Sequence, residues 1–217
     1  MLKKKNNYIP ALLFDFLTPF YDFIVNTGIP VSLLNNELVK HANIMDNYNI
    51  LDIGCGTGTL IIDIKKKYPG TEVTGLDGDP KILKIAEKKI KRNNLSINLV
   101  QGMSYSLPYA DNSFDRVLSS LMAHHLDYGS KTRTFAEVLR VLKPGGEFLL
   151  LDIGKPENIF MLVLSQFFNL LEESSENIKG ILPKMIENAG FYNVEVVYTR
   201  STIIGSLSMI KGTKILK

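Results

Sequence analysis

Three glycines stand at alternate positions directly after a short apolar run. Gly54, Gly56 and Gly58 follow the run from Ile50 to Ile53, and a helical pattern begins behind them. Glycine has no Cβ, so the backbone of such a loop can turn sharply and approach a ligand closely. Because open α/β sheets bind ligands at the carboxyl ends of their strands, the loop predicts a nucleotide-like cofactor here. A dinucleotide fingerprint would place its third glycine where this chain has Thr59.

Further short apolar runs alternate with helical stretches along the middle of the chain. A parallel sheet that is covered by helices on both faces produces this alternation. The expected strands are Ile50 to Ile53, Glu72 to Leu76, Ile97 to Val100, Phe114 to Ser119 and Glu147 to Asp152. The chain then closes with a helix that ends at Gly190, a strand around Val194 to Tyr198 and a last run from Ile204 to Ile210.

Residues that typically cap helices punctuate this pattern. Asp79 and Pro80 predict an N-cap and a first-turn proline at the start of one helix. The three lysines at 65–67 suit the negative end of another helix. The segment 144–146, Pro-Gly-Gly, is expected to end a helix that contains Leu142 and to turn the chain into the next strand.

Two apolar segments lie outside the alternating pattern. Between Tyr8 and Val25, apolar residues recur at three- and four-residue spacing with one break at Thr18-Pro19, which predicts two short helices joined at a bend. The run from Ile159 to Leu171 predicts a lipophilic helix whose few polar residues share one face. No apolar run reaches the roughly 18 residues that a membrane span requires.

Length and composition describe an ordinary globular chain. With 217 residues, 45% of them hydrophobic and 22% charged, one domain with a sizeable core is expected. The excess of 25 Lys and Arg over 22 Asp and Glu is too small to indicate nucleic-acid binding. The single cysteine, Cys55, cannot form an internal disulfide, and together with the lack of a clean signal sequence it favours a cytoplasmic location.

Four motifs occur in a characteristic order. They are Asp52-Ile-Gly-Cys-Gly-Thr-Gly58, Val73-Thr-Gly-Leu-Asp-Gly-Asp-Pro80, Leu107-Pro-Tyr-Ala-Asp-Asn-Ser-Phe-Asp115 and Arg140-Val-Leu-Lys-Pro-Gly-Gly146. In this order and spacing they resemble the motifs of class I S-adenosylmethionine (SAM) dependent methyltransferases. Within that class the chain is most similar to the ubiquinone- and menaquinone-biosynthesis-like branch, methyltransferase type 11. The match runs from about Asn49 to Asp152 and continues more weakly to the C-terminus.

The resemblance implies a Rossmann-like, doubly wound α/β fold. Its sheet has seven strands, mostly parallel with an antiparallel last strand, and N-terminal helices form a lid. One domain then spans 1–217: a helical lid or N-terminal extension in 1–45, a SAM-binding core in 46–152, and substrate-side helices and last strands in 153–217. The implied activity is methyl transfer from SAM to a small acceptor, with S-adenosylhomocysteine as the product.

The resemblance also assigns roles at the glycine loop. The bare backbone of Gly54, Gly56 and Gly58 would lie against the methionine and ribose of SAM. Asp52 would help to hold the ammonium end of the cofactor, with turn capping as the alternative role. Asp77 corresponds to the acid that accepts hydrogen bonds from the two ribose hydroxyls, a task that suits the two oxygens of a carboxylate.

Four further positions complete the cofactor site that the resemblance implies: Gly78, Met103, Ser104 and Ser119. Relatives usually carry Asp or another polar residue near the adenine amine after the third strand, whereas this chain reads Gly102-Met103-Ser104. Met103 can only pack on the adenine ring. Recognition of the amine is therefore expected to depend on Ser104 or on backbone groups.

His124 and His125 follow the fourth expected strand, at the same sheet edge as the glycine loop. Because imidazole titrates near neutrality, either ring is a candidate base for the acceptor, with a marginal preference for His125. Stacking on the cofactor or capping the next loop is the alternative for both. The order His124-His125-Leu-Asp127 lacks the ligand spacing of a zinc site, so no metal is expected. We interpret Cys55 as a small packing residue rather than a nucleophile.

The class of acceptor is inferred from the apolar segments 8–25 and 159–171. In this architecture both would cover the cofactor end of the sheet, and their Phe and Leu side chains favour a lipophilic or aromatic acceptor, quinol-like or lipid-like. Tyr21 and Asp22 in the first segment are candidate contacts to cofactor or acceptor. Simple coverage of the sheet is the alternative role of both segments.

Macromolecular acceptors are disfavoured by the motifs that the chain lacks. DNA amino-methylating enzymes carry Asp/Asn-Pro-Pro-aromatic after the fourth strand, where this chain has Ser119-Ser-Leu-Met122, and no basic, aromatic stripe is present for nucleic acid. Two other function classes stay open. One is an NAD(P)-type Rossmann oxidoreductase. The other is a SAM-binding protein without catalysis, whose basic start at Lys3-Lys4-Lys5 makes a transient contact with an anionic membrane surface. The oligomeric state is left open.

Overall fold

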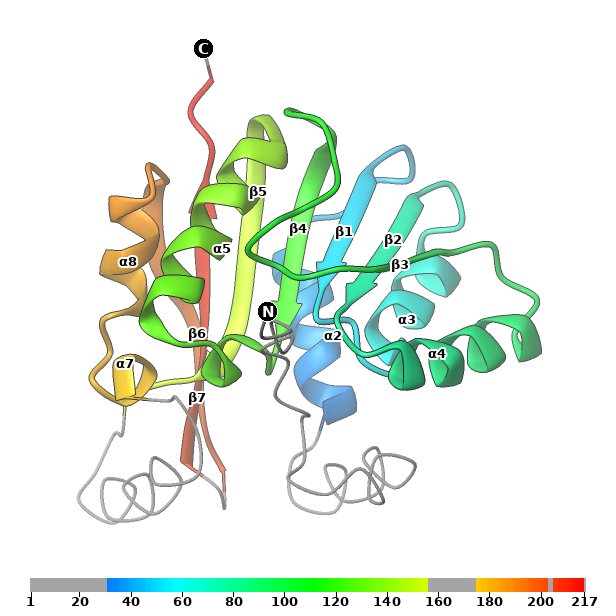
Figure 1. Cartoon of the computed structure of the whole chain (residues 1–217), viewed down its shortest axis with the longest axis horizontal. Coiled ribbons are helices and arrows are strands. Elements are labelled where there is room, and N and C mark those ends of the chain that lie inside the picture. The colour runs from blue at the N-terminus through cyan, green and yellow to red at the C-terminus, as the bar shows by residue number, and fades with distance from the viewer. Residues whose placement is uncertain (1–30, 156–174, 203–204, 217) are drawn as a thin grey trace, which may run out of the picture.

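The computed structural model describes residues 31–155, 175–202 and 205–216. Seven strands form one sheet in the order β3-β2-β1-β4-β5-β7-β6 (Figure 1). They are β1 (Asn49–Ile53), β2 (Glu72–Asp77), β3 (Asn98–Gln101), β4 (Phe114–Ser120), β5 (Leu142–Ile153), β6 (Tyr192–Thr202) and β7 (Gly205–Thr213). β1 to β5 pair in parallel, whereas β7 runs antiparallel to both β5 and β6. The predicted Rossmann-like sheet with an antiparallel last strand is confirmed.

Helices cover both faces of this sheet, as the alternating pattern predicts. One face carries α2 (Val31–His41), α3 (Thr59–Lys67) and α4 (Pro80–Arg92), and the other carries α5 (Tyr128–Val141) and α8 (Leu182–Asn188) (Figure 1). Successive residues of a strand point to opposite faces, so β5 contributes Leu149 to the core beneath α3 and Leu150 to the core beneath α5. Burial on both faces explains the apolar runs of the central strands β1 and β5.

The helix starts follow the predicted capping chemistry, but one boundary differs. Asp79 caps α4 and accepts a hydrogen bond from Lys81 N–H at 2.8 Å. The helix α5 ends at Val141, and β5 begins at Leu142, so Pro-Gly-Gly at 144–146 lies inside the strand. Leu142 pairs with Phe114, and its carbonyl oxygen accepts a hydrogen bond from the Lys214 ammonium at 2.7 Å. These long-range contacts hold Leu142 extended, which helical periodicity does not reveal.

Several predicted features fall outside the part of the chain that the structure describes. They are the helices expected within 8–25 and 159–171, and with them Tyr21 and Asp22. Within the described ranges, no helix is both long and apolar enough to cross a membrane.

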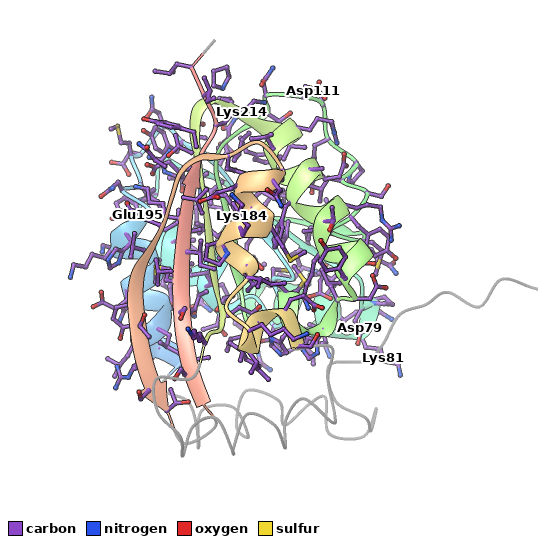
Figure 2. All side chains as sticks on the ribbon, turned by 90° about the vertical axis from the view of Figure 1, so that its left-hand side faces the viewer. Asp79, Lys81, Asp111, Lys184, Glu195 and Lys214 are labelled. Carbon is purple, nitrogen blue, oxygen red and sulfur yellow. The ribbon has the colours of Figure 1, made fainter. Side chains whose placement is uncertain are left out.

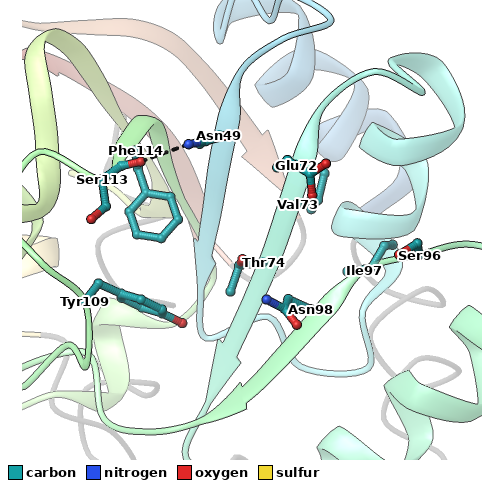
Figure 3. Close-up of a pocket in the computed structure, with 10 residues that line it drawn as sticks. All are labelled: Asn49, Glu72, Val73, Thr74, Ser96, Ile97, Asn98, Tyr109, Ser113 and Phe114. Carbon is teal, nitrogen blue, oxygen red and sulfur yellow. Dashed lines mark hydrogen bonds between the residues drawn. The ribbon is translucent and has the colours of Figure 1, made fainter.

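An irregular segment, residues 102–113, connects β3 to β4 across the α5 side of the sheet (Figure 1). Arg140 on α5 holds it by donating hydrogen bonds to the carbonyl oxygens of Leu107 (3.0 Å) and Tyr109 (2.7 Å). Between this segment and the amino ends of three strands lies a cavity of about 490 Å³ (Figure 3), lined by Asn49, Glu72, Val73, Thr74, Ser96, Ile97, Asn98, Tyr109, Ser113 and Phe114. The glycine loop follows the carboxyl end of β1, so this cavity is separate from it.

Arg116 on β4 ties together the amino half of the sheet. Its side chain is buried, and its Nε donates a hydrogen bond to the carbonyl oxygen of Ala42 at 2.6 Å. Its Nη2 lies 3.1 Å from Glu147 Oε2 on β5, and the guanidinium stacks over the Tyr48 ring, 4.8 Å from the ring centroid. One side chain thus connects the loop before β1 with two central strands.

Replacing Arg116 with Met should lower the free energy of unfolding by about 2 kcal/mol, because the charged hydrogen bonds are lost and the Ala42 oxygen loses this donor. The ion pair between Lys211 and Glu147 (2.6 Å) remains and limits the cost. Urea denaturation of Arg116→Met, beside Arg92→Met on the exposed side of α4, measures the effect. Equal stability of the two variants would contradict the role given to Arg116.

Candidate active site

The glycine loop turns the chain from β1 into α3. Gly54, Gly56 and Gly58 have φ angles of 74°, 53° and 80°, in the left-handed region that disfavours residues with a Cβ. The N–H of Gly54 donates a hydrogen bond to the carbonyl oxygen of Leu76 at 2.8 Å, which fixes the turn against β2. A Cβ at Gly54 would also overlap the Met122 side chain. The turn therefore requires glycine both for its conformation and for space.

Asp77 is the last residue of β2 and faces this turn. Its Oδ2 accepts a hydrogen bond from Gly56 N–H and its Oδ1 accepts one from Asp79 N–H, both at 2.9 Å. Burial raises the pKa of Asp77, and these N–H donors oppose the shift. A carboxylate offers about four acceptor positions, so two backbone bonds orient the group and leave capacity for the diol of a ribose.

Asp52 lies one residue before the end of β1 and is only 2% exposed. Its Oδ1 has no hydrogen-bond partner among the described residues. Burial, together with the negative charge of Asp77, raises the pKa of Asp52 to about 8. An unsatisfied buried carboxyl oxygen costs free energy that a cationic hydrogen-bond donor would recover. The unpaired Oδ1 of Asp52 thus fits the ammonium group of SAM. The neighbouring glycine turn and Asp77 fit its nucleoside.

Cys55 acts as a packing group inside the turn. Its Sγ lies against Gly75 on β2, where an added Cβ would approach it to 2.8 Å. Burial, with the charge of Asp52, raises the pKa of the Cys55 thiol well above its ordinary value. The thiol therefore stays protonated, which agrees with a structural role.

Two of the remaining predicted cofactor residues lie at the same sheet edge. Gly78 follows Asp77 directly, and the carbonyl oxygen of Asp77 accepts a hydrogen bond from Gly102 N–H at 3.0 Å. This bond holds the partly buried Met103 next to the end of β2. The position is compatible with packing on a bound adenine, and that contact stays a prediction.

Two predicted serines are buried. The Ser104 hydroxyl is paired at 2.9 Å with that of Thr134 on α5, so this hydroxyl is already engaged. Recognition of an adenine amine by Ser104 or by backbone groups of the segment stays a prediction. Ser119 is fully buried in β4, and its Oγ has no hydrogen-bond partner within the described part of the chain.

The two histidines belong to η2 (Ala123–His125), a single 3-10 turn directly after β4. Leu121 precedes this turn with φ 54°, an unusual value for a residue with a branched side chain. The rings of His124 and His125 lie 4.1 Å apart, centroid to centroid. Burial, together with the charge of His124, lowers the pKa of His125 to about 3, so His125 is neutral and a weak base near pH 7.

Asp152 contacts the histidine turn, and the sequence interpretation did not single it out. It lies at 1% exposure one residue before the end of β5, and its Oδ1 is 2.7 Å from His124 Nδ1. A pattern pointing to it was present, because Asp152 is an acid that directly follows the apolar run 148–151 near the carboxyl end of β5. Asp52 and Asp77 likewise stand at the carboxyl ends of β1 and β2.

The raised pKa of Asp52 should make the stability of the unliganded protein depend on pH. The unfolded carboxyl group ionises near 3.8, whereas the folded one keeps its proton to about pH 8. Between these values the folded state binds more protons. Asp52 should therefore lower the free energy of unfolding as the pH rises, by about 1.4 kcal/mol per pH unit. Asp52→Asn should remove this component in denaturant titrations across that range, and parallel pH dependences of the two proteins would contradict it.

The amino-acid sequence is similar to those of known methyltransferases. A family model described as a methyltransferase domain matches residues 50–146. The demethylmenaquinone methyltransferase of Listeria welshimeri is 31% identical over 212 residues, which cover 85% of this chain and 88% of that protein. The demethylmenaquinone methyltransferase of a Geobacillus strain is 28% identical over 202 residues, which cover 82% and 84%.

Solved structures share the fold at lower sequence identity. The YcgJ protein of Bacillus subtilis superimposes with a TM-score of 0.68 at 19% identity and covers 84% of this chain and 98% of its own. A phosphoethanolamine N-methyltransferase of Haemonchus contortus, solved with phosphomonomethylethanolamine and S-adenosylhomocysteine, gives 0.78 at 15% identity, with 94% and 59% covered. The methyltransferase-domain match and the demethylmenaquinone methyltransferases support methyl transfer and give no support to the oxidoreductase alternative. The chain belongs to the class I SAM-dependent methyltransferases, in the branch that contains the demethylmenaquinone methyltransferases.

Proposed function

We propose that this methyltransferase transfers a methyl group to a ring carbon of a reduced, quinone-like aromatic acceptor. The observation that carries the proposal is the 31% identity, over 88% of its length, to a protein named for demethylmenaquinone methylation. General chemistry favours the reduced ring, because an electrophilic methyl group needs an electron-rich carbon and a hydroquinone is richer in electrons than its quinone.

Bound SAM supplies an electrophilic methyl group, whose bond to sulfur breaks with the electron pair remaining on the sulfur. The chain's own residues position that group. The Gly54–Gly58 turn admits the cofactor against bare backbone, Asp52 binds its ammonium end, and Asp77 binds the ribose. Holding two reactants in line can supply roughly 7–11 kcal/mol of the barrier.

The acceptor side needs a group that takes up a proton. When a ring carbon gains a methyl group, it loses its hydrogen as a proton, and loss of a hydroxyl proton makes the ring a better nucleophile. A positioned base is worth about 10² to 10⁴ in rate. The histidine pair of η2 lies at the carboxyl end of β4, the strand that pairs with β1. This position supports the proposal that one of the two histidines is the base that takes the proton from the acceptor.

The apolar segments 8–25 and 159–171 are our proposal for the wall of the acceptor site, with Tyr21 and Asp22 among its contacts. Their Phe and Leu content supports a lipophilic acceptor, which would be drawn from a membrane surface by a transient contact. The chain is proposed to divide into a lid in 1–45, a SAM-binding core in 46–152 and a substrate-side part in 153–217. We also propose a cytoplasmic location. The lone cysteine supports that location.

Asp77→Asn should weaken the binding of S-adenosylhomocysteine at least about tenfold, because a charged acceptor facing two hydroxyls is lost. The amide oxygen still accepts one of the two backbone N–H bonds, and the other bond is lost. Isothermal titration calorimetry measures the affinity. Asp111→Asn is the matched control, since Asp111 is exposed and lies at the end of the molecule opposite to Asp79 (Figure 2). Unchanged affinity in Asp77→Asn would mean that the ribose binds elsewhere.

The acceptor is tested with methyl-labelled SAM and the full chain. The panel contains a demethylated naphthoquinone in its reduced and oxidised forms, with phosphoethanolamine as a lipid-precursor alternative. We expect label in the reduced naphthoquinone only, on carbon. Transfer to phosphoethanolamine without transfer to the reduced naphthoquinone would contradict the proposal.

A further inference from the structure

We propose that Asp152 is a positioning residue that holds His124 with its hydrogen on Nδ1, so that Nε2 of His124 is the base for the acceptor. Which proton Nε2 takes from the acceptor rests on the proposed function. The pairing of Asp152 with His124 does not, because it follows from the contacts of described residues alone.

Four N–H groups donate hydrogen bonds to the Asp152 carboxylate, and the Nδ1 atom of His124 lies within hydrogen-bond distance of it. Its Oδ1 lies 2.7 Å from His124 Nδ1 and accepts hydrogen bonds from Ile153 N–H (2.7 Å) and Asn177 Nδ2 (3.1 Å). Its Oδ2 accepts the N–H groups of Ala123 (2.7 Å) and His124 (3.3 Å). A carboxylate that receives this many donors is held in its ionised form, and an ionised carboxylate can only accept. The hydrogen of the His124–Asp152 bond therefore belongs to Nδ1.

The bond determines which nitrogen of His124 is basic. A neutral imidazole carries one hydrogen, so a hydrogen fixed on Nδ1 leaves the lone pair on Nε2. The same carboxylate stabilises the imidazolium that forms when Nε2 takes a proton. This is the division of labour known from the Ser-His-Asp triad, where the acid orients the imidazole and does not itself take the proton.

The charges around the pair are consistent with this assignment. Although burial alone would raise the pKa of Asp152, the charge and hydrogen bond of His124 bring it below its ordinary value. From α5, the fully buried Lys131 contributes a positive charge, which is paired with Glu176 on α7 (Ser175–Ile178) at 2.9 Å. His125, on the same turn as His124, keeps a neutral ring. Asp152 is thus a negative group in direct contact with His124.

The geometry also separates the two roles that Asp152 could have. Its Oδ2 caps the η2 turn, whereas its Oδ1 contacts the imidazole. Asp152→Asn retains the shape and one acceptor oxygen, so it can keep the cap. In the orientation that keeps the cap, the NH₂ group lies beside His124, and the Ile153 N–H and the Asn177 amide lose their acceptor. A donor beside Nδ1 favours the tautomer with hydrogen on Nε2. That tautomer has no lone pair on Nε2.

The first test is independent of the acceptor. The chain has three histidines, His41, His124 and His125, so ¹⁵N-labelled imidazoles can be assigned by single substitutions. At alkaline pH, long-range ¹H–¹⁵N spectra should show His124 as the Nδ1–H tautomer in the wild type and as the Nε2–H tautomer in Asp152→Asn. His41, whose Nδ1 donates to the Glu37 carbonyl oxygen at 2.9 Å, serves as the unchanged reference. An Nε2–H tautomer of His124 in the wild type would overturn the inference.

The second test uses turnover with the acceptor that the labelling panel identifies. Asp152→Asn and His124→Ala should each lower kcat about 100-fold. In the His124→Ala background, Asp152→Asn should lower kcat by less than about a further threefold, because the two residues act as one unit. In Asp152→Asn the acid limb of the kcat profile should move to lower pH, since loss of the negative charge lowers the pKa of His124.

Two controls keep these results interpretable. Asp111→Asn should leave kcat and the pH profile unchanged, and the affinity for S-adenosylhomocysteine should stay within about twofold in every variant, which shows that the cofactor site is intact. If the Asp152→Asn and His124→Ala losses multiply, Asp152 is a structural cap only and the inference fails. If no quinone-like acceptor is methylated, the proposed function fails, whereas the tautomer measurement still decides the pairing.

Discussion

A buried carboxylate must find hydrogen-bond donors or positive charge, and this requirement is met in three different ways along one edge of the sheet. Asp152 on β5 has four N–H donors and the His124 ring, and Asp77 on β2 has two backbone donors with acceptor capacity left over. Asp52 on β1 keeps one oxygen without a partner among the described residues, and its pKa is raised to about 8. A carboxyl group that receives fewer hydrogen bonds from the protein has more acceptor positions available to a ligand. On this account Asp52 and Asp77 bind the cofactor, and Asp152 serves another side chain.

The strand order places these acids so that they can act together. Starting from β1, the chain places β2 and β3 on one side of it and then returns to place β4 and β5 on the other side. The boundary between β1 and β4 is therefore a topological switch point, where α/β sheets bind ligands. The proposed cofactor half of the site comes from β1 and β2, whereas the histidine turn follows β4 and is anchored to β5 through Asp152. Met122 connects the halves, because its side chain occupies the space beside Gly54 where a Cβ would lie. A methyl donor on one side and a base on the other is the arrangement that transfer to a weakly acidic acceptor requires.

Local sequence features predicted most of the fold. The Asp79 cap, the glycine turn and the apolar runs of the five expected parallel strands each depend on neighbours within a few residues, and the structure places them as expected. The helix α5 ends before the Pro-Gly-Gly segment that was expected to stop it, because pairing with Phe114 and a hydrogen bond from Lys214 keep Leu142 extended. The Asp152–His124 contact joins residues 28 positions apart, and the Ser104–Thr134 contact joins residues 30 apart. No periodicity encodes such side-chain meetings, so the sequence could indicate Asp152 as a strand end but not its partner.

The central claim is that the unsatisfied carboxyl group of Asp52 is completed by the ammonium group of the cofactor. Calorimetric titration with S-adenosylhomocysteine near pH 7, in buffers of different ionisation enthalpy, tests it most directly. A carboxyl group with a pKa near 8 must ionise when it meets the ammonium group, so the account predicts the release of about one proton per ligand bound, and none in Asp52→Asn. A binding heat that is the same in every buffer for the wild-type protein would contradict it.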